Sequence, residues 1–319
     1  MRTRFTEAFG VEHPVVLGGM GSATVPELVA AVSNAGGLGI QGAAGRRPAE
    51  IEALGTALHG LTERPFGLNL LLFMADEAQI AATLAAAAPV FSSAWPRPDQ
   101  DLSALFDRAH AAGSRVMHMV STVEEAERAA GAGADVIVAQ GTEGGGHVGQ
   151  ISTMVIVPMV VRAVTPLPVL AAGGIATGAG LAAALMLGAE GVLLGTRFLA
   201  SRESPWPESF KRAIVASDGH DTLLTEIPDI AKGNVWPGAY DRVQRNGLIA
   251  EWAGREHEVR RHASAIAAEM AKARRENDPT RGELNFGQAA GLIDDVPFAA
   301  ELVVRIVREA GERLVSQQR

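Results

Sequence analysis

The sequence contains no cysteine among its 319 residues. Disulfide bonds, thiolate nucleophiles, and zinc ions or iron–sulfur clusters held by cysteine are therefore excluded together. Histidines at metal-binding spacing and histidine–carboxylate motifs are also missing, so we expect no metal site. Aromatic residues make up only 5% of the chain, with Tyr240 as the single tyrosine. Histidine and the glycine-rich segments remain as the main candidates for chemistry.

The chain also lacks a surplus of positive charge. Its 28 Lys and Arg residues and 36 Asp and Glu residues give a formal net charge of −8. Proteins that bind nucleic acid usually carry a basic patch or stripe, so we expect no nucleic-acid partner. The segment Ala163–Ala189 is free of charge, but several prolines and glycines interrupt it, which favours a buried strand and helix over a membrane span. The charged N-terminal segment is unlike a secretory signal, so we expect a cytoplasmic protein with no membrane partner.

Short apolar runs alternate with Ala- and Leu-rich stretches typical of helices through the first two-thirds of the chain. Alternating β and α units predict a parallel sheet, whose strands are buried on both faces and read as continuous apolar runs. The predicted strands are Val15–Leu17, Gly37–Ile40, Phe66–Leu71, Val90–Ser93, Arg115–Val120, Val136–Ala139, Pro168–Ala171 and Gly191–Leu194.

Eight such strands predict an α/β fold that closes into a (β/α)8 TIM barrel rather than an open sheet. The last helix of the barrel does not follow directly, because a polar region interrupts the pattern after the eighth strand. We therefore expect strands one to eight in residues 1–204, a helical insertion acting as a lid in residues 205–281, and a return segment with the closing helix in residues 282–319.

Two glycine-rich loops follow the seventh and eighth predicted strands. TIM barrels commonly bind phosphate there, because backbone N–H groups exposed by glycine donate hydrogen bonds to an anion. Gly173 and Gly174 stand in the first loop, and Gly195 and Thr196 in the second. The run 178–183 also matches the G-x-G-x-x-A dinucleotide pattern, but it does not directly follow its strand and is better interpreted as the start of a helix.

The segment after the sixth predicted strand holds the main candidate for catalysis. Five of the nine residues in Gly141–Gly149 are glycine, which lets the backbone approach a flat ligand closely. His147 lies among them, and an imidazole on a flexible loop at the barrel mouth can exchange protons near neutral pH. A solvent-facing histidine without a catalytic role is the alternative. His118, near the end of the fifth strand, is held in reserve.

These segments together resemble the nitronate monooxygenase family, formerly called 2-nitropropane dioxygenases. Its relatives include flavin-dependent NAD(P)H:quinone reductases and flavin-dependent enoyl-acyl-carrier-protein reductases. The resemblance covers nearly the whole chain, and its order and spacing are more specific than any single motif. It is carried by the segments 4–7, 14–20, 33–39, 66–70, 140–149, 172–175, 195–198 and 287–293.

The resemblance implies an FMN cofactor at the barrel mouth. Gly19, Met20 and Asn69 would then line the flavin ring, with Gln140 and Gly145 nearby. The resemblance also assigns the phosphate to the two glycine-rich loops already singled out. Gln288 would approach the flavin from the lid side.

Two positions depart from patterns seen among the relatives. Some relatives carry a lysine after strand five that reaches the flavin phosphate, whereas this chain has Met119, so anion binding would rest on backbone N–H groups. One subgroup of nitronate oxidisers surrounds its substrate with several tyrosines, which a chain with Tyr240 alone does not match.

Three functions are compatible with the sequence. The first is FMN-dependent oxidation of alkyl nitronates by dioxygen to a carbonyl compound and nitrite, with His147 as general base or hydrogen-bond donor. The second is an FMN-dependent oxidoreductase that takes electrons from NAD(P)H as co-substrate and passes them to a quinone or an enoyl thioester. The third is a barrel that only binds a phosphorylated metabolite. All three imply a small-molecule ligand, and a homodimer is compatible with each.

Overall fold

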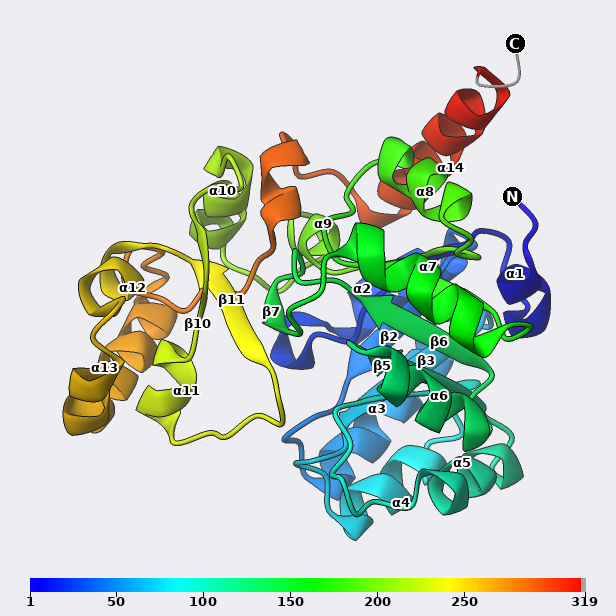
Figure 1. Cartoon of the computed structure of the whole chain (residues 1–319), viewed down its shortest axis with the longest axis horizontal. Coiled ribbons are helices and arrows are strands. Elements are labelled where there is room, and N and C mark those ends of the chain that lie inside the picture. The colour runs from blue at the N-terminus through cyan, green and yellow to red at the C-terminus, as the bar shows by residue number, and fades with distance from the viewer. Residues whose placement is uncertain (317–319) are drawn as a thin grey trace.

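The computed structural model describes residues 1–316 and contains a closed eight-stranded barrel (Figure 1). Neighbouring barrel strands are parallel, and β1 pairs with both β2 and β9, which closes the ring. The predicted TIM barrel is confirmed, with strand bounds within two residues of the expectation. The strands are β1 (Val15–Leu17), β2 (Leu38–Gly42), β3 (Phe66–Leu71), β4 (Val90–Ala94), β5 (Arg115–Val120), β6 (Val136–Gln140), β8 (Val169–Ala172) and β9 (Val192–Leu194).

Helices surround the barrel and cover its outer face. They are α2 (Pro26–Asn34), α3 (Pro48–Leu61), α4 (Glu77–Ala85), α5 (Leu102–Ala111), α6 (Val123–Gly131), α7 (Thr153–Val164), α8 (Gly178–Met186) and α14 (Ala299–Ser316). The amphipathic α14 packs against α8 and α2, so the last helix closes the outer layer as expected. Gly178 begins α8 with Thr177 as its cap, which confirms the interpretation of the dinucleotide-like run as a helix start. None of the helices in residues 1–316 has both the length and the apolar character that crossing a membrane requires.

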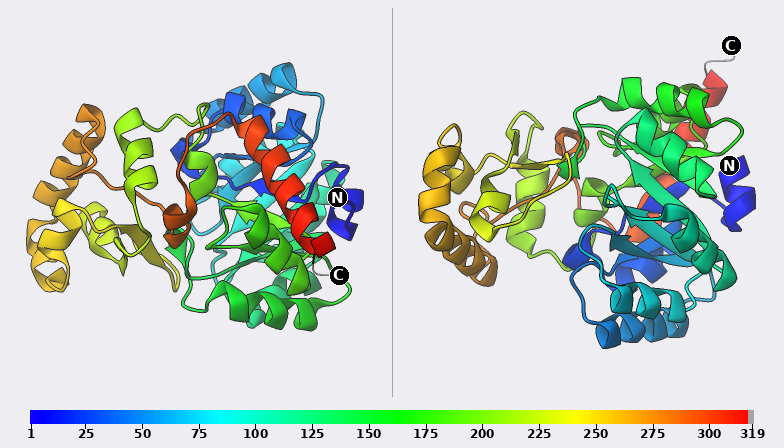
Figure 2. Two further views of the ribbon diagram at one scale, coloured as in Figure 1. Left: turned by 90° about the horizontal axis from the view of Figure 1, so that it is seen from above. Right: turned by 60° about the horizontal axis from the view of Figure 1, so that its bottom comes forward.

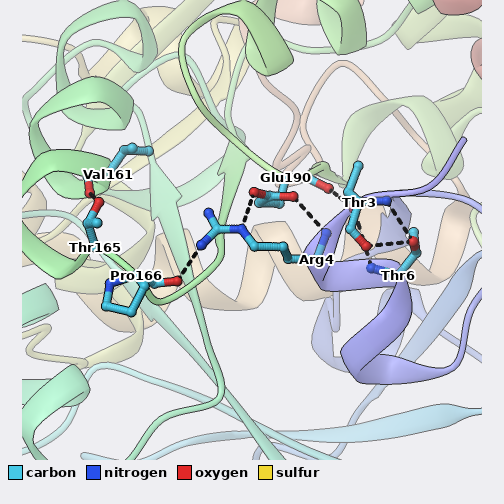
Figure 3. Close-up of polar contacts among 7 residues, drawn as sticks. All are labelled: Thr3, Arg4, Thr6, Val161, Thr165, Pro166 and Glu190. Atoms are coloured by element: carbon cyan, nitrogen blue, oxygen red, sulfur yellow. Dashed lines mark hydrogen bonds and ion pairs between the residues drawn. The ribbon is translucent and has the colours of Figure 1, made fainter.

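Helix α1 (Arg4–Phe9) closes the N-terminal end of the barrel. Its Phe5 and Phe9 are buried among the inward-facing residues of the strands. Figure 3 shows how this helix is fixed: the Arg4 guanidinium contacts Glu190 and donates to the carbonyl of Pro166, and the Thr3 hydroxyl donates to the carbonyl of Glu190. Because α1 covers the N-terminal end of the barrel, ligands would reach the barrel interior from the opposite, C-terminal end of the strands.

The insertion after β9 lies to one side of the barrel in all three views (Figures 1 and 2). The short α9 (Thr196–Leu199) leads into it, and the short η2 (Gln288–Leu292) leads back. Its core is a separate apolar cluster that includes Val243, Leu248, Val259 and Ile266. The insertion comprises α10 (Glu208–Ala216), β10 (Thr222–Thr225), α11 (Ile227–Lys232), β11 (Tyr240–Gln244), α12 (Gly247–Trp252) and α13 (Glu256–Glu276).

The insertion is not purely helical, which refines the expectation for residues 205–281. Its strands β10 and β11 form an antiparallel sheet, and the third strand of that sheet is β7 (Gly146–Val148) from the glycine-rich segment of the barrel. Within this ladder, Asp241 lies opposite His147. The insertion and the loop after β6 are therefore joined by backbone pairing as well as by side chains.

Candidate active site

A cavity of about 650 Å³ lies at the C-terminal mouth of the barrel, beneath the insertion. Sites for small molecules and cofactors commonly have volumes of about 300–1,000 Å³. Ten of the eleven residues singled out in the sequence line it: Gly19, Met20, Asn69, Gln140, Gly145, His147, Gly173, Gly174, Gly195 and Thr196.

Gln288 is the residue that lies elsewhere. It lines a second cavity of about 320 Å³, and its backbone N–H donates to the carbonyl of Glu143. The two cavities share Gly173 and Gly174. Gln288 therefore approaches the site beside the glycine loop after β8, because the return segment crosses the barrel mouth there.

The loops after β8 and β9 hold free backbone donors. Within residues 1–316, the N–H groups of Gly173, Gly174, Gly195 and Thr196 donate to no protein acceptor. Gly173 and Gly174 have φ of +97° and +70°, a conformation that L side chains rarely adopt. The Thr196 hydroxyl oxygen accepts from the N–H of Gly287, and its own O–H can still donate to a ligand. An anion in this corner would be bound mainly by backbone N–H groups, with the Thr196 O–H as a further donor.

Two glycines of Gly141–Gly149 also have a packing role that we did not predict. A Cβ on Gly141 would lie 2.3 Å from the Thr153 nitrogen, and one on Gly145 would lie 2.5 Å from the Gly287 nitrogen. These glycines therefore allow close packing against α7 and the return segment. The segment is also not the flexible loop we predicted, since residues 146–148 form β7.

Two side chains offer polar groups on the barrel wall of the cavity. Asn69, in the second half of β3, donates through its side-chain amide to the Ser92 hydroxyl at 3.1 Å. Gln140 ends β6, and its side-chain oxygen is buried without a hydrogen-bond partner within residues 1–316. A buried polar atom without a partner is costly, which suits a ligand that donates a hydrogen bond here.

His147 is held on three sides by residues of the insertion. Its Nε2 lies 2.9 Å from Oδ2 of Asp229, which lies in the first turn of α11. The indole of Trp236 stacks on the imidazole, with ring centroids 3.4 Å apart and planes 9° from parallel. Asp241 lies across the β7–β11 ladder. Histidine and two carboxylates thus meet here although no such motif is visible in the sequence, because the fold brings Asp229 and Asp241 to His147 from 82 and 94 positions away.

Asp241 is the most perturbed acid in this group. Its side chain is fully buried, and its two oxygens accept from the side-chain amide of Asn285 at 2.7 and 2.9 Å. Burial raises the pKa of Asp241 to about 7, although the nearby His147 acts in the opposite direction. Near neutral pH this carboxyl group is therefore present in both its protonated and its ionised form.

Replacing Asp241 with Asn should change how stability depends on pH. The folded pKa lies above the unfolded value of ~3.9, so folded wild-type protein binds more protons and loses stability as pH rises from about 4 to about 7. Asp241→Asn removes this loss, so its melting temperature relative to wild type should rise between about pH 4 and about pH 7 and stay constant above that. Thermal melts in matched buffers measure the difference. A constant difference across this range would contradict the raised pKa.

His118 does not lie at the mouth, although we held it in reserve. It is buried on the outer side of β5 near Phe106, and its Nδ1 lies 2.8 Å from the Ser93 hydroxyl. Burial lowers the pKa of His118 to about 3, so the ring stays neutral. Its neighbour Met119 points the other way and lines the cavity, as strand alternation requires.

Several cavity residues were not identified from the sequence. Trp95 directly follows β4 and lines the cavity. Its φ of +54° is unusual for a residue other than glycine, and such backbone strain is often found at functional sites. Trp236, Lys232 and Arg274 reach the cavity from the insertion. Strand-end position was a usable signal for Trp95. No local pattern marks the other three, because the insertion places them.

Trp236 and Tyr240 make a matched pair for testing the insertion. Trp236 stacks on His147, whereas Tyr240 is 37% exposed and does not line the cavity. Trp236→Leu should lower turnover about tenfold, because loss of aromatic stacking worth ~0.5–1.5 kcal/mol frees the imidazole. Tyr240→Phe should leave turnover unchanged. Steady-state kinetics with flavin content measured in parallel tests this, and equal effects of both changes would refute the assignment.

The strand ends of this (β/α)8 barrel enclose a cavity lined by glycines and by the imidazole of His147. TIM-barrel enzymes place their active sites at this end of the barrel. The chain belongs to the nitronate monooxygenase family, whose family model matches residues 2–95 and 87–309. It is therefore an oxidoreductase, as the resemblance implied.

Similar proteins include members with different names. A (3aS,4S,5R,7aS)-5-hydroxy-7a-methyl-1-oxo-octahydro-1H-indene-4-carboxyl-CoA dehydrogenase of Rhodococcus jostii is 34% identical, over 98% of this chain and 97% of that protein. A probable nitronate monooxygenase of Staphylococcus saprophyticus is 30% identical over 98% of both chains. Among solved structures, FabK from Thermotoga maritima has a TM-score of 0.89 at 33% identity, over 100% of this chain and 99% of that one. Nitroalkane oxidase from Streptomyces ansochromogenes has a TM-score of 0.84 at 28% identity, over 98% and 99%.

Proposed function

We propose that this protein is an FMN-dependent oxidoreductase that converts alkyl nitronates and dioxygen into a carbonyl compound and nitrite. The observation that carries the proposal is His147, whose imidazole lines the cavity while its Nε2 is engaged by Asp229. A base at this position suits the removal of a carbon-bound proton from a neutral nitroalkane. Family membership and the similarity to a nitroalkane oxidase support the same reaction class.

The residues present are suited to FMN. The free N–H groups of Gly173, Gly174, Gly195 and Thr196 would bind its phosphate. Gly19, Met20, Asn69, Gln140 and Gly145 would line the ring, with the unpartnered Gln140 oxygen as an acceptor. When bound, FMN supplies the electron acceptor and the site of reaction with dioxygen.

The chain's own groups would bind the substrate and handle its proton. The apolar indoles of Trp95 and Trp236 limit the access of water to the space beside His147. The imidazole would take the proton of a neutral nitroalkane at Nδ1. With a nitronate, which has already lost that proton, the same ring would act as a hydrogen-bond donor when protonated.

A reductase is the second candidate, and one feature of the insertion favours it. Arg274 lines the cavity and lies over the ring of Phe210 at 5.3 Å, with no ion pair in the described part of the chain. Lys232, paired with Glu283 at 2.7 Å, lies on the same wall. These cations suit an anionic co-substrate such as NAD(P)H, or a CoA thioester of the kind named for the Rhodococcus relative. Electrons would then pass to a quinone or an enoyl thioester.

Two spectroscopic measurements test the proposal. The visible spectrum of purified protein should show bound flavin; a colourless protein that takes up no FMN would support a barrel that only binds a metabolite. Anaerobic mixing then separates the two reactions. Bleaching of the flavin by a nitronate alone supports the monooxygenase, whereas rapid bleaching by NADH or NADPH and none by a nitronate would replace it with the reductase.

A further inference from the structure

The base at the barrel mouth and the groups that hold it come from different parts of the chain. His147 belongs to β7 after the sixth barrel strand, whereas Asp229 and Trp236 belong to the insertion. The side chains of His147 and Asp229 are 13% and 8% exposed, so water competes little for the contact between them. A hydrogen bond to a charged group in such surroundings is stronger than one at the surface.

The contact with Asp229 involves Nε2 of the imidazole, so Nδ1 is the ring nitrogen left to act on a ligand. An ionised carboxylate accepts only, so Asp229 places the imidazole proton on Nε2. Nδ1 makes no hydrogen bond within residues 1–316, and His147 lines the cavity. In this tautomer Nδ1 carries the lone pair, and the stacked Trp236 restricts rotation of the ring.

We propose that Asp229 is a positioning residue, and that the insertion acts as part of the catalytic machinery by setting the tautomer and orientation of His147. The assignment rests on the proposed function, in which His147 Nδ1 removes a proton from the substrate. Asp229 would also stabilise the imidazolium that forms when Nδ1 accepts that proton, since the Nε2 proton stays in place throughout. No group other than the substrate and the imidazole exchanges a proton in this step.

The charged surroundings of His147 are defined by three elements. Asp229 comes from α11, and Asp241 lies opposite on β11 and is bound by Asn285 of the return segment. Glu283, on the same return segment, is paired with Lys232. Within the described residues, the Oδ2 atom of Asp229 has the imidazole of His147 as its side-chain partner, and the buried Oδ1 atom has none.

The test compares two changes that each remove one negative charge from the start of α11. Asp229→Asn removes the carboxylate at the imidazole. Glu226→Gln removes an exposed carboxylate three residues earlier, whose side chain makes no hydrogen bond or ion pair in residues 1–316. Asp229→Asn should reduce turnover of a neutral nitroalkane about 10²-fold and that of its preformed nitronate much less, because general-base catalysis contributes about 10²–10⁴-fold. Glu226→Gln should change neither rate, and Asp229→Glu should recover part of the loss.

A proton NMR measurement on the protein without substrate separates this inference from the proposed reaction. A histidine N–H bound to a buried carboxylate exchanges slowly and gives a downfield resonance. That resonance should be present in wild type and Glu226→Gln and absent in Asp229→Asn and His147→Gln. Its survival in Asp229→Asn would overturn the inference whatever the substrate proves to be. If wild type shows the resonance but turns over no nitroalkane, the proposed reaction fails and the positioning role stands.

A metal ion is an alternative explanation for the close approach of His147, Asp229 and Asp241. The ligand atoms of His147, Asp229 and Asp241 lie within 4.8 Å of one another. Equal activity of wild type before and after dialysis against EDTA, and an unchanged downfield resonance on adding Zn²⁺, are the results expected here. Activity lost with EDTA and restored by a metal would overturn the positioning role of Asp229.

Discussion

Replacing His147 with Ala should abolish most turnover of neutral nitroalkanes while leaving FMN bound. The loss expected for removal of a general base is about 10²–10⁴-fold. Preformed nitronates should be affected less, because they have already lost the proton in question. Steady-state rates for one nitroalkane and its nitronate, measured on the same preparation, give this ratio. If the enzyme is a reductase, flavin reduction by NAD(P)H should persist while protonation of the acceptor slows.

The His147→Ala experiment needs a second variant, because the change also leaves Asp229 buried without its partner. Leaving a buried carboxylate without its hydrogen-bond donor costs about 1–3 kcal/mol of stability, and more when the carboxylate is charged. His147→Gln keeps an N–H that can donate to Asp229 but provides no base, so it should fold better and show the same kinetic defect. Full activity of both variants with every acceptor would rule out an essential proton-transfer role for this residue.

Replacing Gly174 with Leu should yield folded protein that purifies largely without colour. The residue has a φ of +70°, and a Cβ there would lie 3.1 Å from the Glu143 Cβ, so a branched side chain would obstruct the space beside the free N–H groups. The flavin-to-protein ratio after denaturation and release of the cofactor measures the effect.

Gly113→Leu is the matched control for this change. Gly113 has a φ of +84° with no atom within 4 Å of an added Cβ. Both substitutions impose backbone strain of about 1–3 kcal/mol, but only the first touches the cavity. Stoichiometric FMN in Gly174→Leu would show that the phosphate binds elsewhere, and equal flavin loss in both variants would point to strain alone.

The barrel was predictable because its signals are local. Each strand is a short apolar run followed by a helical stretch, and most of the turns between them contain glycine or proline. The ends of β8 and β9 could be assigned to the site for the same reason, since a barrel places all its strand ends around one mouth. Even Gln288 was found near the site, although it lines the neighbouring cavity.

The partners of His147 could not be predicted, because tertiary pairing alone brings them to it. Asp229 is a single acid among the mostly apolar residues of α11, which marks no site in the sequence. Strand β11 carries Asp241, Arg242 and Gln244, which hide its strand character. His118 illustrates the opposite error. A histidine near a strand end was counted as a mouth residue, but strand alternation points it outward into the layer between barrel and helices.

The β7–β11 ladder limits how the family could be re-engineered or could diverge. An insertion transferred from one barrel to another would carry Asp229 and Trp236 with it. It would lack β7, the strand that pairs with β11 and holds His147. The recipient's own loop after β6 would have to match it at three successive backbone pairs, Val148 with Tyr240, His147 with Asp241 and Gly146 with Arg242. Residues 141–149 and 222–244 therefore form one exchangeable unit, and chimeras that keep both segments from the same parent should be the ones that retain activity.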